Sequence, residues 1–334
     1  MIRRKYNLNL CLAIALGAIL LTLALGVLQK QFGIFTGADV LGIKIAKSVR
    51  FFQLTLGMVA VSWLGDEIGL MIAVCVIFWL GYTTEMITFL LLLLFGNVIN
   101  THLKEFFELS RPQSHEISRL VGAEGYGYPS GHSQTGMLYA WLIYAFVQRY
   151  WYVCLTAALL MAASRIYLGV HYVSDTVGGL ICGLGLVVGA TGIYGHVREL
   201  SQLRESIQHS LALKVGLSFL LSAAYLALAW GQPQAFRYAG LLAGFFMVYS
   251  MLGFRWRQRN PLFTIIVIVV GLVVLLSIRI GLALALPQNE LSNYCRYFIL
   301  GFFLAISPLF FVKIRLLKNV EEESRDNKQA QVAR

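Results

Sequence analysis

Residues 104–175 contain the side chains of this sequence that could carry out chemistry. Three segments stand out there: Lys104-(x)6-Arg111-Pro112, Tyr128-Pro129-Ser130-Gly131-His132-Ser133, and Ser164-Arg165-(x)5-His171-(x)3-Asp175. Cationic side chains bind phosphate oxygens, and imidazole and carboxylate groups transfer or position protons. The residue types therefore predict a site that binds and processes a phosphate group.

The first segment places two cations, Lys104 and Arg111, seven residues apart. Seven residues are two helical turns, so the two side chains are predicted to share one face of an extended helix. Pro112 disfavours helical backbone at Arg111, and the helix is expected to end there. Taken alone, the pair is also typical of cations that reach from a membrane-helix end toward the interface.

The second segment directly precedes an apolar run and has the features of a helix start. Ser130 is the predicted N-cap, and Gly131 allows the backbone to approach a ligand closely. Free N–H groups and the helix dipole favour an anion at such a position, within reach of His132. An ordinary helix start without any ligand has the same pattern.

The third segment places Asp175 four residues after His171. On a helix, this spacing lets the carboxylate accept the ring N–H, which fixes the tautomer and leaves the other nitrogen as a nucleophile. Arg165 lies six residues before His171, and Gly169 permits a break between two helices. Ionisable groups at a membrane-helix end are candidates for function, although an isolated His–Asp pair of this spacing can also be structural.

The composition indicates that membrane helices position these residues. The chain is 58% hydrophobic and only 13% charged, with a mean hydropathy of +0.71. A soluble protein of 334 residues could not bury that much apolar surface. The apolar runs are too long for the strands of a membrane barrel. The net charge of +11 is interpreted as a membrane-topology signal, and no nucleic-acid partner is predicted.

We predict an all-α, polytopic membrane bundle of about ten spans, with a six-helix core and four further helices. The expected spans are residues 8–28, 68–82, 86–103, 133–147, 151–169, 172–194, 215–230, 238–254, 262–284 and 297–312. An interfacial helix is expected at 51–64. The predicted domains are a core at 1–195, a charged linker at 196–214, additional membrane helices at 215–312, and a charged, disordered tail at 313–334.

The distribution of positive charge predicts the orientation of these spans. With the N-terminus in the cytoplasm, most of the later Lys and Arg residues fall in inward loops, which agrees with the positive-inside rule. These residues are Arg149, Arg198, Arg204, Lys214, Arg255, Arg257, Arg259, Lys313, Arg315 and Lys318. The same count places all three motif segments together on the outer face. Their positive charges, and those between Lys30 and Arg50, are exceptions to the rule.

Considered together, the three segments resemble the type 2 phosphatidic acid phosphatase superfamily, which includes glucose-6-phosphatase and the vanadium haloperoxidases. Its pattern is KxxxxxxRP, PSGH and SRxxxxxHxxxD, and all three parts occur here in order without a substitution. The resemblance covers about residues 50–195. The last four predicted spans lie outside this common core.

The resemblance implies a role for each motif residue. His171 would attack phosphorus to form a phosphohistidine, Asp175 would orient His171, and His132 would protonate the leaving oxygen and then activate water. The phosphoryl oxygens would be held by a further set of residues: Lys104, Arg111, Ser130, Gly131 and Arg165. No metal or other cofactor is implied, because side chains supply the positive charge. Arg119, Glu124 and Tyr126 lie between the first two motifs and are weaker candidates for a head-group pocket.

The leading hypothesis is a metal-independent phosphatase for a lipid phosphate or diphosphate, embedded in the membrane. A lipid phosphotransferase using the same intermediate, a phosphatase for a soluble ester, and a haloperoxidase remain alternatives, as does a transporter or anionic-lipid-binding protein. The expected location is a bacterial inner membrane with the site facing the periplasm. The identity of the lipid and the oligomeric state are left open.

Overall fold

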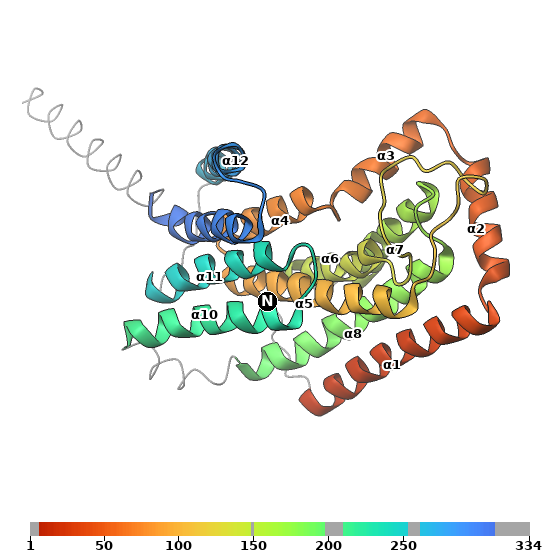
Figure 1. Ribbon diagram of the computed structural model, residues 1–334, viewed down its shortest axis with the longest axis horizontal. Helices are drawn as coiled ribbons and strands as arrows, with labels where there is room; N and C mark the ends of the chain where they lie inside the picture. The colour runs from red at the N-terminus through yellow and green to blue at the C-terminus, as the bar shows by residue number, and fades with distance from the viewer. Residues whose placement is uncertain (1–6, 148–149, 198–209, 253–260, 311–334) are drawn as a thin grey trace, which may run out of the picture. The chain divides into compact units, whose positions relative to one another are not determined.

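The computed structural model describes residues 7–147, 150–197, 210–252 and 261–310, and every regular element within these ranges is an α-helix (Figure 1). The helices are α1 (Leu8–Phe32), α2 (Thr36–Ser48), α3 (Phe52–Trp63), α4 (Glu67–Trp79), α5 (Thr83–Phe107), α6 (Gly131–Val147), α7 (Trp151–Tyr167), α8 (Val173–Val197), α10 (Leu211–Leu228), α11 (Ala235–Leu252), α12 (Pro261–Ala285) and an unlabelled last helix, Glu290–Phe310. The predicted all-α fold is confirmed.

Seven of the described helices are long and apolar enough to cross a membrane. They are α1, α5, α8, α10, α11, α12 and Glu290–Phe310, each 18–25 residues long. The other three predicted spans correspond to α4, α6 and α7, which have 13, 17 and 17 residues. These helices are shorter than the roughly 20 residues that a perpendicular crossing requires.

The predicted interfacial helix at 51–64 is α3, and it is joined to α4 through a short break. Together the two helices are long and apolar enough to cross a membrane, but they are bent by 62° at the break. Ahead of them, the predicted mixed segment at 29–50 contains the separate helix α2.

The described chain divides into two compact units. The first comprises Met1–Val74 and Thr84–Leu203, and the second comprises Cys75–Thr83 and Arg204–Arg334. The predicted tail, residues 198–209 of the predicted linker, and most of the basic loop residues used for the orientation lie outside the described residues.

In the first unit, α8 packs lengthwise against α1, and α6 packs against both α7 and α8 (Figure 1). The approach of α8 to α1 depends on small residues. A methyl group added at Gly185 would lie 2.9 Å from Cβ of Ala18, and one at Gly189 would lie 3.1 Å from Cβ of Ala15. Such a small-residue seam is the usual means of close packing between membrane helices. It fixes α8, which carries Asp175.

In the second unit, α11 packs against α10 and against the helix Glu290–Phe310. A methyl group at Gly240 or Gly244 of α11 would collide with the backbone of Tyr294 or Phe298 in that last helix. The indole N–H of Trp79 donates to Oγ of Ser307 at 2.8 Å, which satisfies a buried donor. The unit is therefore a tightly packed helical bundle.

Candidate active site

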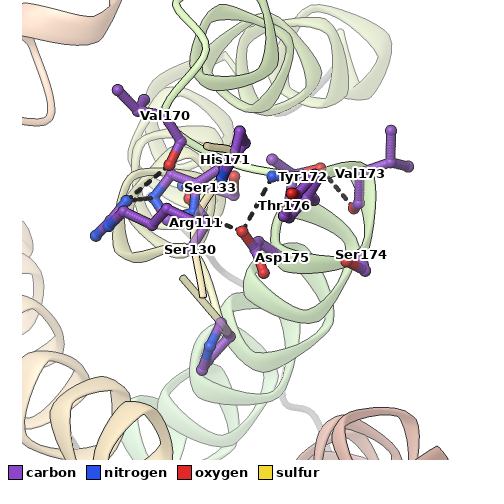
Figure 2. Close-up of polar contacts among 12 residues, drawn as sticks. Arg111, Ser130, Ser133, Val170, His171, Tyr172, Val173, Ser174, Asp175 and Thr176 are labelled. Carbon is purple, nitrogen blue, oxygen red and sulfur yellow. Dashed lines mark hydrogen bonds and ion pairs between the residues drawn. The ribbon is translucent and has the colours of Figure 1, made fainter. Parts of the chain in front are cut away.

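The three sequence motifs meet in the first unit. Figure 2 shows Arg111 of the first motif and Ser130 of the second beside His171 and Asp175 of the third. Hydrogen bonds join the motifs directly, among them one from Arg111 to the His171 ring at 2.8 Å and one from the backbone N–H of Ser130 to the carbonyl of Asp175 at 2.8 Å. Residues separated by up to 60 positions therefore form one buried cluster.

The prediction that Lys104 and Arg111 share a helix face is wrong. Helix α5 ends at Phe107, and Glu108 adopts a left-handed conformation with φ of +54°. A left-handed residue stops a helix because its backbone can no longer continue the repeating hydrogen bonds. The terminator is therefore Glu108, three residues before the one expected from Pro112. Lys104 stays in the last turn of α5, whereas Arg111 lies on the following loop.

The loop position lets the Arg111 guanidinium fold back into the protein, where it is 7% exposed. Its nitrogens donate to the backbone carbonyls of Glu124, Gly125 and Val170 at 2.8–3.0 Å. Burial lowers the pKa of Arg111, but an arginine side chain remains charged at neutral pH. A fixed positive charge is therefore held beside His171.

The prediction that His171 and Asp175 lie on the same helix is correct only for Asp175. Helix α8 begins at Val173, so His171 lies in the preceding turn and Asp175 lies in the first turn. Oδ2 of Asp175 accepts the N–H of Tyr172 at 3.0 Å and lies 3.0 Å from Nδ1 of His171. The carboxylate thus caps the helix start and holds the imidazole at the same time. This contact assigns the ring proton to Nδ1 and leaves Nε2 with its lone pair.

His171 is only 2% exposed, and several positive groups surround it. Burial and then the charges of Arg111, Lys104 and Arg165 hold the pKa of His171 well below its ordinary value of 6.5. The charge of His132 acts in the same direction. The imidazole is therefore neutral at pH 7, as a nucleophilic nitrogen requires.

The second motif forms the start of α6, as its sequence pattern predicts. The hydroxyl of Ser130 accepts the N–H of Ser133 at 3.4 Å, in the manner of an N-cap. Asn100 of α5 supports this turn, because its amide donates to the carbonyl of Pro129 at 3.2 Å and to Oε1 of Gln134 at 3.1 Å. The sequence pattern did not single out Asn100 as a contributor to the site.

Two buried polar atoms of the motifs have no hydrogen-bond partner among the described residues: Oγ of Ser133 and Nε of Arg165. Buried polar groups are nearly always paired, so unpaired ones call for an explanation. Both belong to motif segments, and Ser133 is fully buried at the first turn of α6. Both atoms belong to segments whose helix start and cationic side chains suit an anion.

His132 contacts a residue that the sequence did not mark as part of the site. Nε2 of His132 lies 3.0 Å from Oδ1 of Asp66, in the break between α3 and α4. Arg165 of the third motif donates from Nη1 to the hydroxyl of Ser62, near the same break. Asp66 and Ser62 belong to none of the three motifs, and their only sequence signal was the interruption of an apolar run.

The weaker head-group candidates have other contacts in the structure. Arg119 donates from Nη2 to the carbonyl of Pro112 at 2.8 Å, so it braces the loop between the first two motifs. Glu124 contributes its backbone carbonyl to Arg111, and the hydroxyl of Tyr126 donates to Oε1 of Glu108 at 3.2 Å. None of these contacts by itself indicates a head-group pocket.

Comparisons with known proteins agree with the motif pattern. Residues 85–198 match the sequence profile of the PAP2 superfamily, the type 2 phosphatidic acid phosphatases, and residues 236–320 match the profile described as "PAP2 superfamily phosphatase, transmembrane extension". The first region contains all three motifs. The second covers most of the four C-terminal spans that lie beyond the common core.

Phosphatidylglycerophosphatase B of Bacillus subtilis (strain 168) is 32% identical over a region that is 34% of this chain and 61% of the relative. The matched region is therefore less than two thirds of that relative's length. A crystal structure described as that of the first transmembrane PAP2 type phosphatidylglycerolphosphate phosphatase from Bacillus subtilis is 26% identical, with a TM-score of 0.48, and the match covers 55% of this chain and 96% of that one. Because both profile matches describe parts of one superfamily, the chain belongs to the PAP2 superfamily.

Proposed function

We propose that this protein hydrolyses a membrane lipid phosphate through a phosphohistidine intermediate on His171. One observation carries the proposal: the buried ring of His171 lies between Asp175 on Nδ1 at 3.0 Å and Arg111 on Nε2 at 2.8 Å. The first contact fixes the tautomer, and the second places a positive charge beside the nitrogen that would attack phosphorus. This is the arrangement of a nucleophile with an orienting carboxylate.

In the first step, Nε2 of His171 forms a bond to phosphorus as the bond from phosphorus to the lipid oxygen breaks. The proton that the departing oxygen needs comes from His132. Positive charge from Lys104, Arg111 and Arg165 stabilises the phosphoryl oxygens as negative charge develops in the transition state. Each well-placed donor of this kind contributes about 3 kcal/mol.

In the second step, water attacks the phosphohistidine. His132, now neutral, takes the proton from water, and the bond between phosphorus and Nε2 breaks to release inorganic phosphate. Asp175 keeps the ring of His171 in place through both steps. No metal enters this scheme, because the side chains supply the positive charge, and activity is expected to persist in the presence of a chelator.

The first candidate substrate is phosphatidylglycerophosphate, which is the lipid named by the phosphatidylglycerophosphatase relative. A lipid substrate also suits the long apolar helices of the chain, since its phosphate can reach the site while its acyl chains stay in the bilayer. The proposed setting is a bacterial inner membrane, with the site on the periplasmic face.

The test is phosphate release by the purified full chain in detergent with EDTA. The substrate panel contains phosphatidylglycerophosphate, phosphatidate, a sphingoid-base phosphate and a polyprenyl diphosphate. We expect turnover of at least one lipid by the wild type, none by His171→Ala, and wild-type turnover by the matched control His115→Ala, which changes an exposed loop histidine. Full turnover by His171→Ala would contradict the proposed nucleophile.

A further inference from the structure

The break between α3 and α4 is built against His132. Nε2 of His132 lies 3.0 Å from Oδ1 of Asp66, and a methyl group added at Gly65 would collide with the same ring. The hydroxyl of Tyr139, two helical turns further along α6, donates to the carbonyl of Leu64 at 2.8 Å. Three successive residues of the break therefore lie against α6: Leu64, Gly65 and Asp66.

The same break also reaches the third motif. The hydroxyl of Ser62, in the last turn of α3, accepts a hydrogen bond from Nη1 of Arg165. Ser62 is buried, whereas the Asp66 side chain is 54% exposed and the His132 side chain is 18% exposed. Asp66 thus meets His132 at the more accessible side of the cluster.

We propose that Asp66 is a positioning residue for His132. Its carboxylate accepts a hydrogen bond from Nε2–H, fixes the orientation of the ring, and stabilises the imidazolium form that protonates the leaving group. This inference rests on the proposed phosphatase function and adds a second His–Asp pair to the one formed by His171 and Asp175. Asp66 would act on the substrate through His132, and its charge also interacts with that of Arg165.

The pairing specifies which atom transfers the proton. With Nε2–H held by Asp66, Nδ1 of His132 gives its proton to the lipid oxygen as the bond between phosphorus and that oxygen breaks. Asp66 stays a carboxylate throughout, so the only proton that moves comes from the imidazolium. In the second step, the same Nδ1 takes a proton from water.

This role predicts a dependence on the leaving group. A lipid alcohol leaves poorly as an alkoxide and needs the proton, whereas p-nitrophenolate leaves without protonation. Loss of Asp66 should therefore slow phosphorylation of His171 by a lipid phosphate much more than phosphorylation by p-nitrophenyl phosphate. A residue that only bound phosphate or supported the fold would affect both substrates equally.

The experiment compares kcat/KM for phosphatidate and p-nitrophenyl phosphate in the full chain in detergent. For Asp66→Asn we expect a loss of about 10- to 100-fold with phosphatidate and a much smaller loss with p-nitrophenyl phosphate. Asp66→Glu should recover part of the phosphatidate activity. Glu67→Gln, which removes the neighbouring carboxylate, should leave both values at the wild-type level.

A second variant tests the same idea with Asp66 intact. Gly65→Ala places a methyl group against the His132 ring and should cause the same selective loss with phosphatidate. Equal losses on both substrates in Asp66→Asn and Gly65→Ala would overturn the inference. A rise in turnover in Asp66→Asn would also overturn it, because Asp66 would then be competing with the substrate. A wild-type chain that hydrolyses no phosphate ester would instead contradict the proposed function itself.

Discussion

Nη1 of Arg111 donates a hydrogen bond to Nε2 of His171 at 2.8 Å, and the same nitrogen of Arg111 donates to the carbonyl of Val170 at 2.8 Å (Figure 2). The guanidinium of the first motif therefore covers the nitrogen that the proposed reaction uses as its nucleophile. A bound phosphoryl group can take over this donor, which would leave the lone pair of Nε2 facing phosphorus. In the proposed mechanism, substrate binding would therefore expose the nucleophile.

The pH dependence of activity should reflect this contact. The pKa of His171 is held well below 6.5, first by burial and then by the charge of Arg111. Protonation removes the lone pair of Nε2, so activity is lost only when the pH falls through this lowered pKa. We expect the acidic limb of the kcat/KM profile well below pH 6.5 in the wild type.

In Arg111→Gln, one positive charge beside His171 is gone, so the acidic limb should move to higher pH. The value of kcat/KM at neutral pH should also fall about 100-fold or more, because a transition-state donor is lost. The measurement is the pH–rate profile with p-nitrophenyl phosphate. Lys44→Gln, which removes an exposed cation on α2, is the matched control and should leave the profile unchanged. An unmoved limb in Arg111→Gln would contradict the electrostatic argument.

A second prediction concerns the loop that covers Asp175. A methyl group added at the buried Gly127 would lie 2.7 Å from Oδ2 of Asp175, the oxygen that holds His171. Gly127→Ala should therefore displace the carboxylate and lower kcat about 10- to 100-fold, with little change in KM. Gly122→Ala in the same loop, where a methyl group meets nothing within 4 Å, should retain wild-type kcat. A wild-type kcat in Gly127→Ala would contradict the prediction, because it would mean that the added methyl group does not displace the Asp175 carboxylate.

Asp39 of α2 offers a stability test. Its carboxylate accepts hydrogen bonds from the N–H of Ser174 at 2.8 Å and from Oγ of Ser174 at 2.9 Å, which ties α2 to the first turn of α8. Asp39→Ala leaves these buried donors unpaired, so the free energy of unfolding should fall by about 1–3 kcal/mol. Thermal unfolding in detergent measures this change. Ser48→Ala, an exposed change at the end of α2, should leave the Tm unchanged.

Helix packing in the second unit supplies a fourth prediction. A methyl group at Gly244 would collide with the carbonyl oxygen of Phe298, whereas one at Gly281 meets nothing within 4 Å. Gly244→Ala should lower the free energy of unfolding by about 1–3 kcal/mol because it overpacks the contact. Gly281→Ala should be neutral or slightly stabilising, since alanine favours a helix more than glycine does. Because all motif residues lie in the first unit, kcat below the unfolding temperature should stay at the wild-type level in both variants.

The sequence alone determined the fold class and the chemical groups of the site. Apolar runs predict membrane helices because length and hydropathy are local properties of the chain. The start of α6 was predictable for the same reason, since Ser130 caps a helix that begins at the next residue. The resemblance of the three motifs to the superfamily pattern predicted one chemical set, consisting of Lys104, Arg111, His132, Arg165, His171 and Asp175.

The tertiary structure decided how these groups meet. The left-handed backbone at Glu108 ends α5 early, which frees Arg111 to reach His171 from a loop. Asp66 contacts His132, which is 66 residues away in the sequence, and Asp39 contacts Ser174, which is 135 residues away. No local pattern encodes such contacts, because they depend on where a bent helix pair and a packed α2 place their side chains in space. The sequence therefore predicted the reactive groups and the His171–Asp175 pair, whereas packing determined that Asp66 contacts His132.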